Sequence, residues 1–66
     1  MIKKAEDYHS KGYQAWKQGD YRQAIHFYDE SLKIKPDYFK ALFNRGFAYD
    51  KLGEYDNAIK DYSSAI

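Results

Sequence analysis

The segment GDYRQAI, residues 19–25, recurs 34 residues later as GEYDNAI, residues 53–59. The match extends outward on both sides without a gap. The identical pairs are Gly12/Gly46, Lys17/Lys51, Gly19/Gly53, Tyr21/Tyr55, Ala24/Ala58, Ile25/Ile59 and Tyr28/Tyr62. Self-similarity at a fixed period of this length is typical of repeat architectures, in which each repeat is one supersecondary unit. We therefore expect two stacked copies of one unit.

Each copy contains two stretches of helical periodicity separated by a short turn. The turns are Gly19-Asp20 and Gly53-Glu54, where the glycine can adopt the left-handed conformation and close the preceding helix. Asp20 can cap the next helix, and Glu54 is the poorer cap. Pro36 lacks an amide donor, so it should end the second helix and open the turn between the copies. The pattern predicts an all-α chain of antiparallel helical hairpins, with four helices over 3–18, 21–34, 37–52 and 55–66.

Small residues recur where the two helices of a hairpin should come closest. These are Gly12 and Ala24 in the first copy and Gly46 and Ala58 in the second. A bulky side chain at such a point would keep the helices apart, whereas the neighbouring tyrosines and phenylalanines can fill the grooves beside it. The repeated small positions therefore predict tight packing inside each hairpin.

The composition excludes several classes of protein. The chain has 66 residues, which suits one small domain, and it lacks cysteine, so a disulfide framework and a thiolate metal site are ruled out. Eleven basic and ten acidic residues give a net charge of +1, which argues against nucleic acid as a partner. No apolar run approaches the length of a membrane span, and Met1–Lys4 is not followed by a signal-peptide core. We expect no membrane partner and a cytoplasmic protein.

The spaced residues above resemble the tetratricopeptide repeat (TPR). The first copy carries the resemblance in Gly12, Gly19, Asp20, Tyr21, Ala24, Ile25, Tyr28, Leu32 and Pro36, and the second in Gly46, Tyr49, Gly53, Tyr55, Ala58, Ile59, Tyr62 and Ala65. The resemblance implies a right-handed α-solenoid. It divides a single domain, residues 1–66, into repeat 1 at about 5–38 and an incomplete repeat 2 at about 39–66. TPR proteins usually have three repeats and a capping helix, so this chain is expected to be a truncated piece of a longer array.

The resemblance also implies a function. The first helices of successive TPR repeats line a concave groove that receives peptides or segments of partner proteins. On helical spacing, the groove-facing residues would be Glu6, His9, Tyr13, Lys17, Lys40, Phe43, Asn44, Phe47 and Lys51. This mixture of aromatic rings and amines suits a peptide with an apolar anchor and a carboxylate. The groove spans only two repeats, so the affinity is expected to be modest.

One TPR subfamily binds the C-terminal carboxylate of heat-shock chaperones through Lys, Arg and Asn residues. Asn44 matches the asparagine of its second repeat. His9 and Tyr13 stand where that clamp has a lysine and an asparagine, and they cannot supply the same charge and amide donors. The resemblance therefore implies chaperone binding only in a modified form.

Other conspicuous residues have structural interpretations. His9 and His26 lack metal-ligand spacing and are expected to be solvated, although His9 could touch a peptide in the groove. Trp16 is favoured as a core residue over a groove residue, because it lies one turn before Gly19, where an aromatic ring often closes the hairpin. The pairs Asp29/Lys33 and Asp56/Lys60 have the spacing of helix-stabilising ion pairs, each contributing about 0.2–0.5 kcal/mol. No cofactor and no catalytic residues are expected, because no acid–base pair, nucleophile motif or phosphate loop is present.

Two functions remain open at this stage. The first is a protein–protein interaction module that binds a peptide in the groove. The second is a structural unit that forms a homo-oligomer through its uncapped last helix, where Ile59, Tyr62 and Ile66 would form an uncovered apolar stripe. RNA recognition by helical repeats would need a basic groove and is not favoured.

Overall fold

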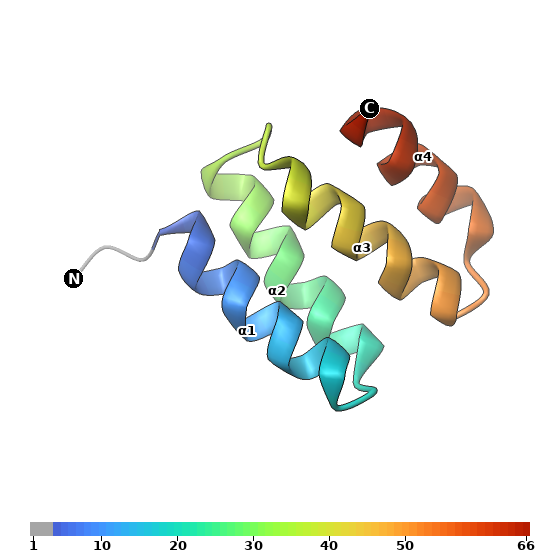
Figure 1. Cartoon of the computed structure of the whole chain (residues 1–66), viewed down its shortest axis with the longest axis horizontal. Coiled ribbons are helices and arrows are strands. Elements are labelled where there is room, and N and C mark those ends of the chain that lie inside the picture. The colour runs from blue at the N-terminus through green and yellow to red at the C-terminus, as the bar shows by residue number, and fades with distance from the viewer. Residues whose placement is uncertain (1–3) are drawn as a thin grey trace.

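The structure is a computed structural model that describes residues 4–66. In that part of the chain the predicted helices are confirmed as α1 (Ala5–Lys17), α2 (Tyr21–Ile34), α3 (Phe39–Lys51) and α4 (Tyr55–Ala65). They lie side by side in chain order as two antiparallel hairpins, α1/α2 and α3/α4 (Figure 1). The expected helix start at residue 3 lies outside the described residues.

Helix α1 begins one residue after Lys4, whose backbone N–H donates to Asp7 Oδ2 at 3.2 Å. Helix α3 begins two residues later than predicted, because Pro36, Asp37 and Tyr38 form the connecting turn. The Tyr38 N–H donates to the Lys35 carbonyl at 3.0 Å, which closes that turn. Pro36 therefore ends α2 and separates the two hairpins, as predicted.

The two hairpin turns have the same geometry. Gly19 and Gly53 have φ values of +81° and +79°, the left-handed region in which a side chain is strained. The following residues, Asp20 and Glu54, each donate a backbone N–H to a carbonyl five residues earlier, both at 2.9 Å. The Asp20 side chain accepts from the Gln23 N–H at 3.3 Å, whereas Glu54 forms no such cap. The predicted difference between the two caps is confirmed.

The helices of each hairpin meet at a glycine and a tyrosine ring. A Cβ atom added to Gly12 would lie 2.6 Å from Tyr28 Cε1, and one added to Gly46 would lie 2.7 Å from Tyr62 Cε1. Both distances are shorter than any normal carbon–carbon contact, so only glycine permits this approach. The prediction that these small residues mark the closest points of the hairpins is confirmed.

The core lies between α1, α2 and α3. It consists of Ala15, Ala24, Tyr28 and Ala41, with Trp16, Leu32 and Tyr38 packed against it. Burial raises the pKa of the Tyr28 hydroxyl to about 12. Helix α1 also contacts α3, whereas α2 and α4 do not approach each other within the described chain. The first helices of the two hairpins therefore share one side of the molecule.

The ion pairs differ from the prediction. Asp29 accepts from Arg45 Nη1 at 2.8 Å, and Lys33 pairs with Glu30 at 2.9 Å, so the expected Asp29/Lys33 pair is wrong. Asp56/Lys60 is not among the ion pairs formed within residues 4–66. The cause is tertiary: Arg45 on α3 reaches between α2 and α4, and spacing along a single helix cannot reveal such a partner.

Candidate functional site

We call the surface formed by α1 and α3 the first-helix face. The repeat places Tyr13 and Phe47 at equivalent positions on it, and both rings are exposed, at 45% and 41%. Lys17 and Lys51 follow one turn later, each in the last turn of its helix. This face therefore presents the same aromatic and lysine pair twice, once in each hairpin.

A hollow of about 490 Å³ lies on this face at the C-terminal ends of α1 and α3. Its lining combines aromatic rings with polar groups: Tyr13, Trp16, Asn44, Phe47, Asp50 and Lys51. Tyr13 and Trp16 stack with their ring planes 9° apart and their centroids 6.1 Å apart. The Lys17 ammonium lies 5.6 Å from the centre of the Tyr13 ring, although Lys17 itself is not part of the lining. The structure thus brings together four of the predicted groove residues, namely Tyr13, Asn44, Phe47 and Lys51.

Two residues of this hollow were missing from the predicted groove. Trp16 packs against the core, as favoured, and it also lines the hollow. The core and groove positions that were treated as alternatives are therefore both occupied by this one side chain. Asp50, its equivalent one repeat later, places a carboxylate at the edge. Trp16 lies three residues after Tyr13, so helical spacing places the two side chains next to each other, and this is the signal that could have found Trp16. Asp50 lies three residues after Phe47 in the same way.

His9 was expected to be solvated, and this expectation is wrong. His9 Nε2 lies 2.8 Å from Asn44 Nδ2, across the boundary between the two hairpins. Its ring stacks on Tyr38 with centroids 5.4 Å apart and planes 16° apart. Burial lowers the pKa of His9, and the nearby Lys40 ammonium lowers it further. With Asn44 as donor, Nε2 must accept, so the neutral imidazole with its proton on Nδ1 fits this position.

Phe43 belongs to a different part of the surface from Tyr13. Its ring packs on Phe47 at 5.0 Å and on Tyr62 of α4 at 5.5 Å, measured between centroids. Phe47 also contacts Tyr62 edge-on at 5.7 Å, so it connects the hollow to this second aromatic cluster. Glu6, Lys17, Lys40 and Phe43 are therefore on or near the first-helix face but outside the lining of the hollow.

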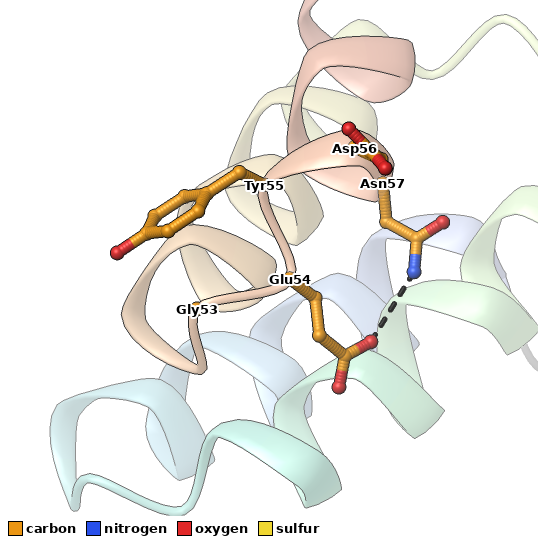
Figure 2. Close-up of a pocket in the computed structure, with 5 residues that line it drawn as sticks. All are labelled: Gly53, Glu54, Tyr55, Asp56 and Asn57. Carbon is orange, nitrogen blue, oxygen red and sulfur yellow. Dashed lines mark hydrogen bonds between the residues drawn. The ribbon is translucent and has the colours of Figure 1, made fainter.

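Two further hollows lie elsewhere. One surrounds Arg45, whose guanidinium is already bound to Asp29 and Asp61. The other lies at the α3–α4 turn and is shown in Figure 2, where Glu54 accepts from Asn57 Nδ2 at 3.2 Å. Glu54 also pairs with Arg22 of the first hairpin. The polar groups of both hollows are thus largely engaged with one another.

The outward side of α4 is apolar and exposed. Tyr55 is 61% exposed and Ile59 is 60% exposed, and Ile66 follows at the end of the chain. Tyr62 was predicted to belong to this uncovered stripe, but it is partly buried against Gly46, Phe43 and Phe47. The stripe therefore consists of Tyr55, Ile59 and Ile66.

The first-helix face carries aromatic rings next to ammonium groups. Aromatic rings with adjacent ammonium groups can hold an apolar side chain and orient a carboxylate.

Within residues 4–66, no three His, Asp or Glu side chains cluster in a way that could hold a metal ion. In the same part of the chain, no helix has the length and apolar character needed to span a membrane.

Comparison with known proteins adds an independent line of evidence. The family model for the TPR repeat matches residues 12–53. The chain is similar to the small glutamine-rich tetratricopeptide repeat-containing protein 2 of Saccharomyces cerevisiae, with 43% identity over 96% of this chain and 18% of that protein. It is also similar to the photosystem I assembly protein Ycf3 of Prochlorococcus marinus, with 36% identity over 97% of this chain and 39% of that protein. It thus spans only part of these relatives. The repeated hairpins and these matches together show that the chain belongs to the tetratricopeptide repeat family.

Proposed function

We propose that this chain is a protein-interaction module that binds a peptide segment of a partner protein on its first-helix face. The observation that carries the proposal is the hollow lined by Tyr13, Trp16, Phe47 and Lys51. A second ammonium group, that of Lys17, lies 5.6 Å from the centre of the Tyr13 ring. Desolvated aromatic surface supplies most of the binding energy in such contacts, and charged groups at the edge set orientation. Similarity to a photosystem I assembly protein supports an interaction role.

The ligand we propose carries an apolar or aromatic side chain next to one or two carboxylates. The apolar group would enter the hollow, and the carboxylates would approach Lys17 and Lys51. Asp50 lies at the edge of the same hollow, so a carboxylate placed on that side would be repelled. This asymmetry predicts that the order of apolar and acidic residues in the peptide affects its affinity.

The contact between Asn44 and His9 affects how well this chain could bind a C-terminal carboxylate in the way of the chaperone-binding TPR subfamily. One N–H of the Asn44 amide already faces His9 Nε2 at 2.8 Å, which holds the side chain in one orientation and leaves a peptide only the second N–H and the carbonyl oxygen unless that contact breaks. We therefore expect peptides that end in a chaperone-type carboxylate to bind more weakly than internal acidic peptides with an apolar anchor.

A titration of the isotopically labelled chain with short capped peptides tests the groove proposal. The first peptide has one Leu flanked by two Glu, the second replaces both Glu by Gln, and the third replaces Leu by Ala. We expect shifts at Tyr13, Trp16, Phe47 and Lys51 with the first peptide and weaker binding of the other two. Phe47→Ala should reduce the affinity about tenfold, the cost of removing an aromatic anchor.

Phe39→Ala is the matched control, because Phe39 lies on the same helix and is 56% exposed but is not part of the hollow. It should leave peptide binding unchanged. Equal losses from both substitutions, or shifts outside the first-helix face, would show that the assigned site is wrong.

A second candidate function is assembly through α4. It is favoured by the exposed stripe of Tyr55, Ile59 and Ile66, since apolar patches of this kind recruit other chains. Its homo-oligomeric form requires a second copy to cover α4. Sedimentation velocity at increasing concentration distinguishes this form, which gives a concentration-dependent dimer, from a chain that stays monomeric.

A further inference from the structure

One side chain links the hollow of the first-helix face to a titratable group. Asn44 lines the hollow, and its Nδ2 atom lies 2.8 Å from Nε2 of His9, which is outside the lining. The two residues belong to different hairpins and are 35 positions apart in the chain. The repeat equivalent of His9 is Phe43, which cannot titrate. This pair is therefore a property of the boundary between the two hairpins and not of the repeat.

The proton on the imidazole determines which side of the Asn44 amide is left for a ligand. A primary amide has a donor nitrogen on one side and an acceptor oxygen on the other. Because Nδ2 faces His9, Oδ1 points away from His9 and is left for a ligand, together with the second N–H. In protonated His9 both ring nitrogens donate. The amide then has to turn over to place Oδ1 against Nε2, and its N–H groups are left for the ligand.

The amide is free to turn, whereas the ring is held by its neighbours. Within residues 4–66 the Asn44 side chain has no hydrogen bond besides the one to His9. The His9 ring stacks on Tyr38 with the planes 16° apart, and Tyr28 of α2 lies beside it with the ring centroids 5.6 Å apart. A change of charge on His9 is therefore converted into a change in the orientation of Asn44.

We infer that His9 is a positioning residue that sets, through Asn44, whether the peptide site accepts or donates a hydrogen bond at this point. With His9 neutral, Asn44 presents its carbonyl oxygen and prefers a peptide group that donates, such as an amide. With His9 protonated, the turned amide presents its N–H groups and prefers a carboxylate. A fall in pH therefore shifts the preference of the site from amide-bearing to acidic peptides. The inference rests on the proposed function, because it concerns the same hollow.

The helices and the turn around His9 contribute other titratable groups. Tyr28 of α2 and Tyr38 of the connecting turn stay neutral at acidic and neutral pH, because burial raises the pKa of both hydroxyls. Burial and the Lys40 ammonium of α3 lower the pKa of His9, so the change takes place below its ordinary value of about 6.5. Glu6, on the same helix as His9, is close enough to act on Tyr38. It is therefore the carboxylate that has to be tested separately.

The free chain tests the orientation of Asn44 without any peptide. At pH 7.5 the nitrogen shifts of the His9 ring should identify the tautomer that is protonated on Nδ1, and nuclear Overhauser contacts should join the Asn44 side-chain N–H groups to that ring. These contacts should weaken as the pH falls to 5, with the midpoint of His9. A ring protonated on Nε2 at pH 7.5, or Asn44 signals that do not follow the His9 midpoint, would overturn the inference.

Peptide binding tests the change of preference. The capped peptide with Leu flanked by two Glu is compared with the two peptides in which one Glu or the other is replaced by Gln, which has the same size but no charge. Asn44 and Lys51 are seven residues apart on α3, about 10 Å along the helix, so the two flanking side chains can reach them separately. Between pH 7.5 and 5 the affinity of the two-Glu peptide should rise about tenfold relative to one of the Gln peptides, the effect of one hydrogen bond to a charged group. The rise should follow the His9 midpoint measured in the same samples.

Three variants of the chain identify the group responsible. His9→Gln should remove the rise, because glutamine does not titrate. His26→Gln is the matched control, since His26 is the other histidine and lines the hollow around Arg45. It should keep the rise, as should Glu6→Gln. If the peptides bind but their ratio of affinities stays constant, or changes equally in His9→Gln, the inference is overturned while the proposed function stands. If no peptide binds at either pH, the proposed function is wrong and the inference fails with it.

Discussion

Arg45 Nε and Nη2 donate to the two carboxylate oxygens of Asp61 at 2.7 and 2.8 Å, so one arginine on α3 holds α4 by a two-point hydrogen bond. The same guanidinium donates through Nη1 to Asp29 of α2 at 2.8 Å. The Asp61 side chain is only 7% exposed. Hydrogen bonding to Asp61, opposed in part by desolvation, raises the pKa of Arg45 above its already high value. Three helices therefore meet at one permanently charged group.

Arg45→Met should destabilise the chain by about 2–4 kcal/mol, because it leaves the buried Asp61 carboxylate without its partner. That loss is a large fraction of the total stability expected for a chain of this size, roughly 3–10 kcal/mol. Urea unfolding monitored by circular dichroism measures the change. Arg22→Met is the matched control, since Arg22 pairs with Glu54 but is 67% exposed. Its effect should stay below about 1 kcal/mol. Similar losses from both variants would contradict the assigned role of Arg45.

Gly12→Ala should destabilise the chain by about 1–3 kcal/mol, because the new Cβ would overlap the ring of the fully buried Tyr28. Gly46→Ala creates the same overlap with Tyr62, but that ring is only partly buried and packs on two exposed phenylalanines that can move. The favourable helix propensity of alanine, about 1 kcal/mol over glycine, should then offset much of the clash at Gly46.

Thermal unfolding of both variants gives the comparison. The expected order is a clearly lower melting temperature for Gly12→Ala and a small change for Gly46→Ala. Equal destabilisation would mean that the second hairpin is packed as rigidly as the first.

The stability of the chain should fall as the pH is lowered through the titration of His9. Burial and the nearby Lys40 ammonium lower the pKa of His9 in the folded state, so the unfolded chain takes up the proton first. The neutral imidazole contributes its full stability above the unfolded pKa of about 6.5, and this contribution is lost as the pH falls through the folded value. Protonation would also remove the Nε2 acceptor that faces Asn44.

Urea unfolding at pH 7, 6 and 5 measures this dependence, and His9→Gln is the variant that isolates it. Glutamine keeps a hydrogen-bonding group beside Asn44 but does not titrate. The slope of stability against pH should therefore be smaller in the variant than in the original chain. An unchanged slope would assign the pH dependence to other groups.

Most of the fold could be predicted because its signals are local and occur twice. The left-handed conformations of Gly19 and Gly53, the cap at Asp20 and the break at Pro36 depend on the backbone of a few neighbouring residues. The 34-residue period then identifies the hairpins. The predicted start of α3 was two residues too early, because the length of the turn after Pro36 depends on how Tyr38 packs against the core.

The candidate site was predicted less completely. Helical spacing put Tyr13, Phe47 and Lys51 on one side of the molecule, and the structure has all three lining one hollow, because residues on one face of a helix remain on that face. The predicted groove left out Trp16 and Asp50, although each lies three residues after a groove residue on the same helix. His9 was treated as solvated, although Asn44 and Tyr38 contact its ring. Those contacts of His9 cross between the hairpins, and the sequence holds no signal for how far one hairpin is rotated against the next.

The sequence by itself determined four helices, two equivalent hairpins and the glycines that permit their close packing, since each of these follows from short-range sterics and backbone hydrogen bonding. Only the tertiary structure decided that Arg45 joins Asp29 to Asp61, that His9 contacts Asn44, and that Ile59 lies bare where Ile25 is covered. The physical reason is that these features depend on distances between side chains on different helices. Such distances are set by how the hairpins pack and not by the periodicity within either one.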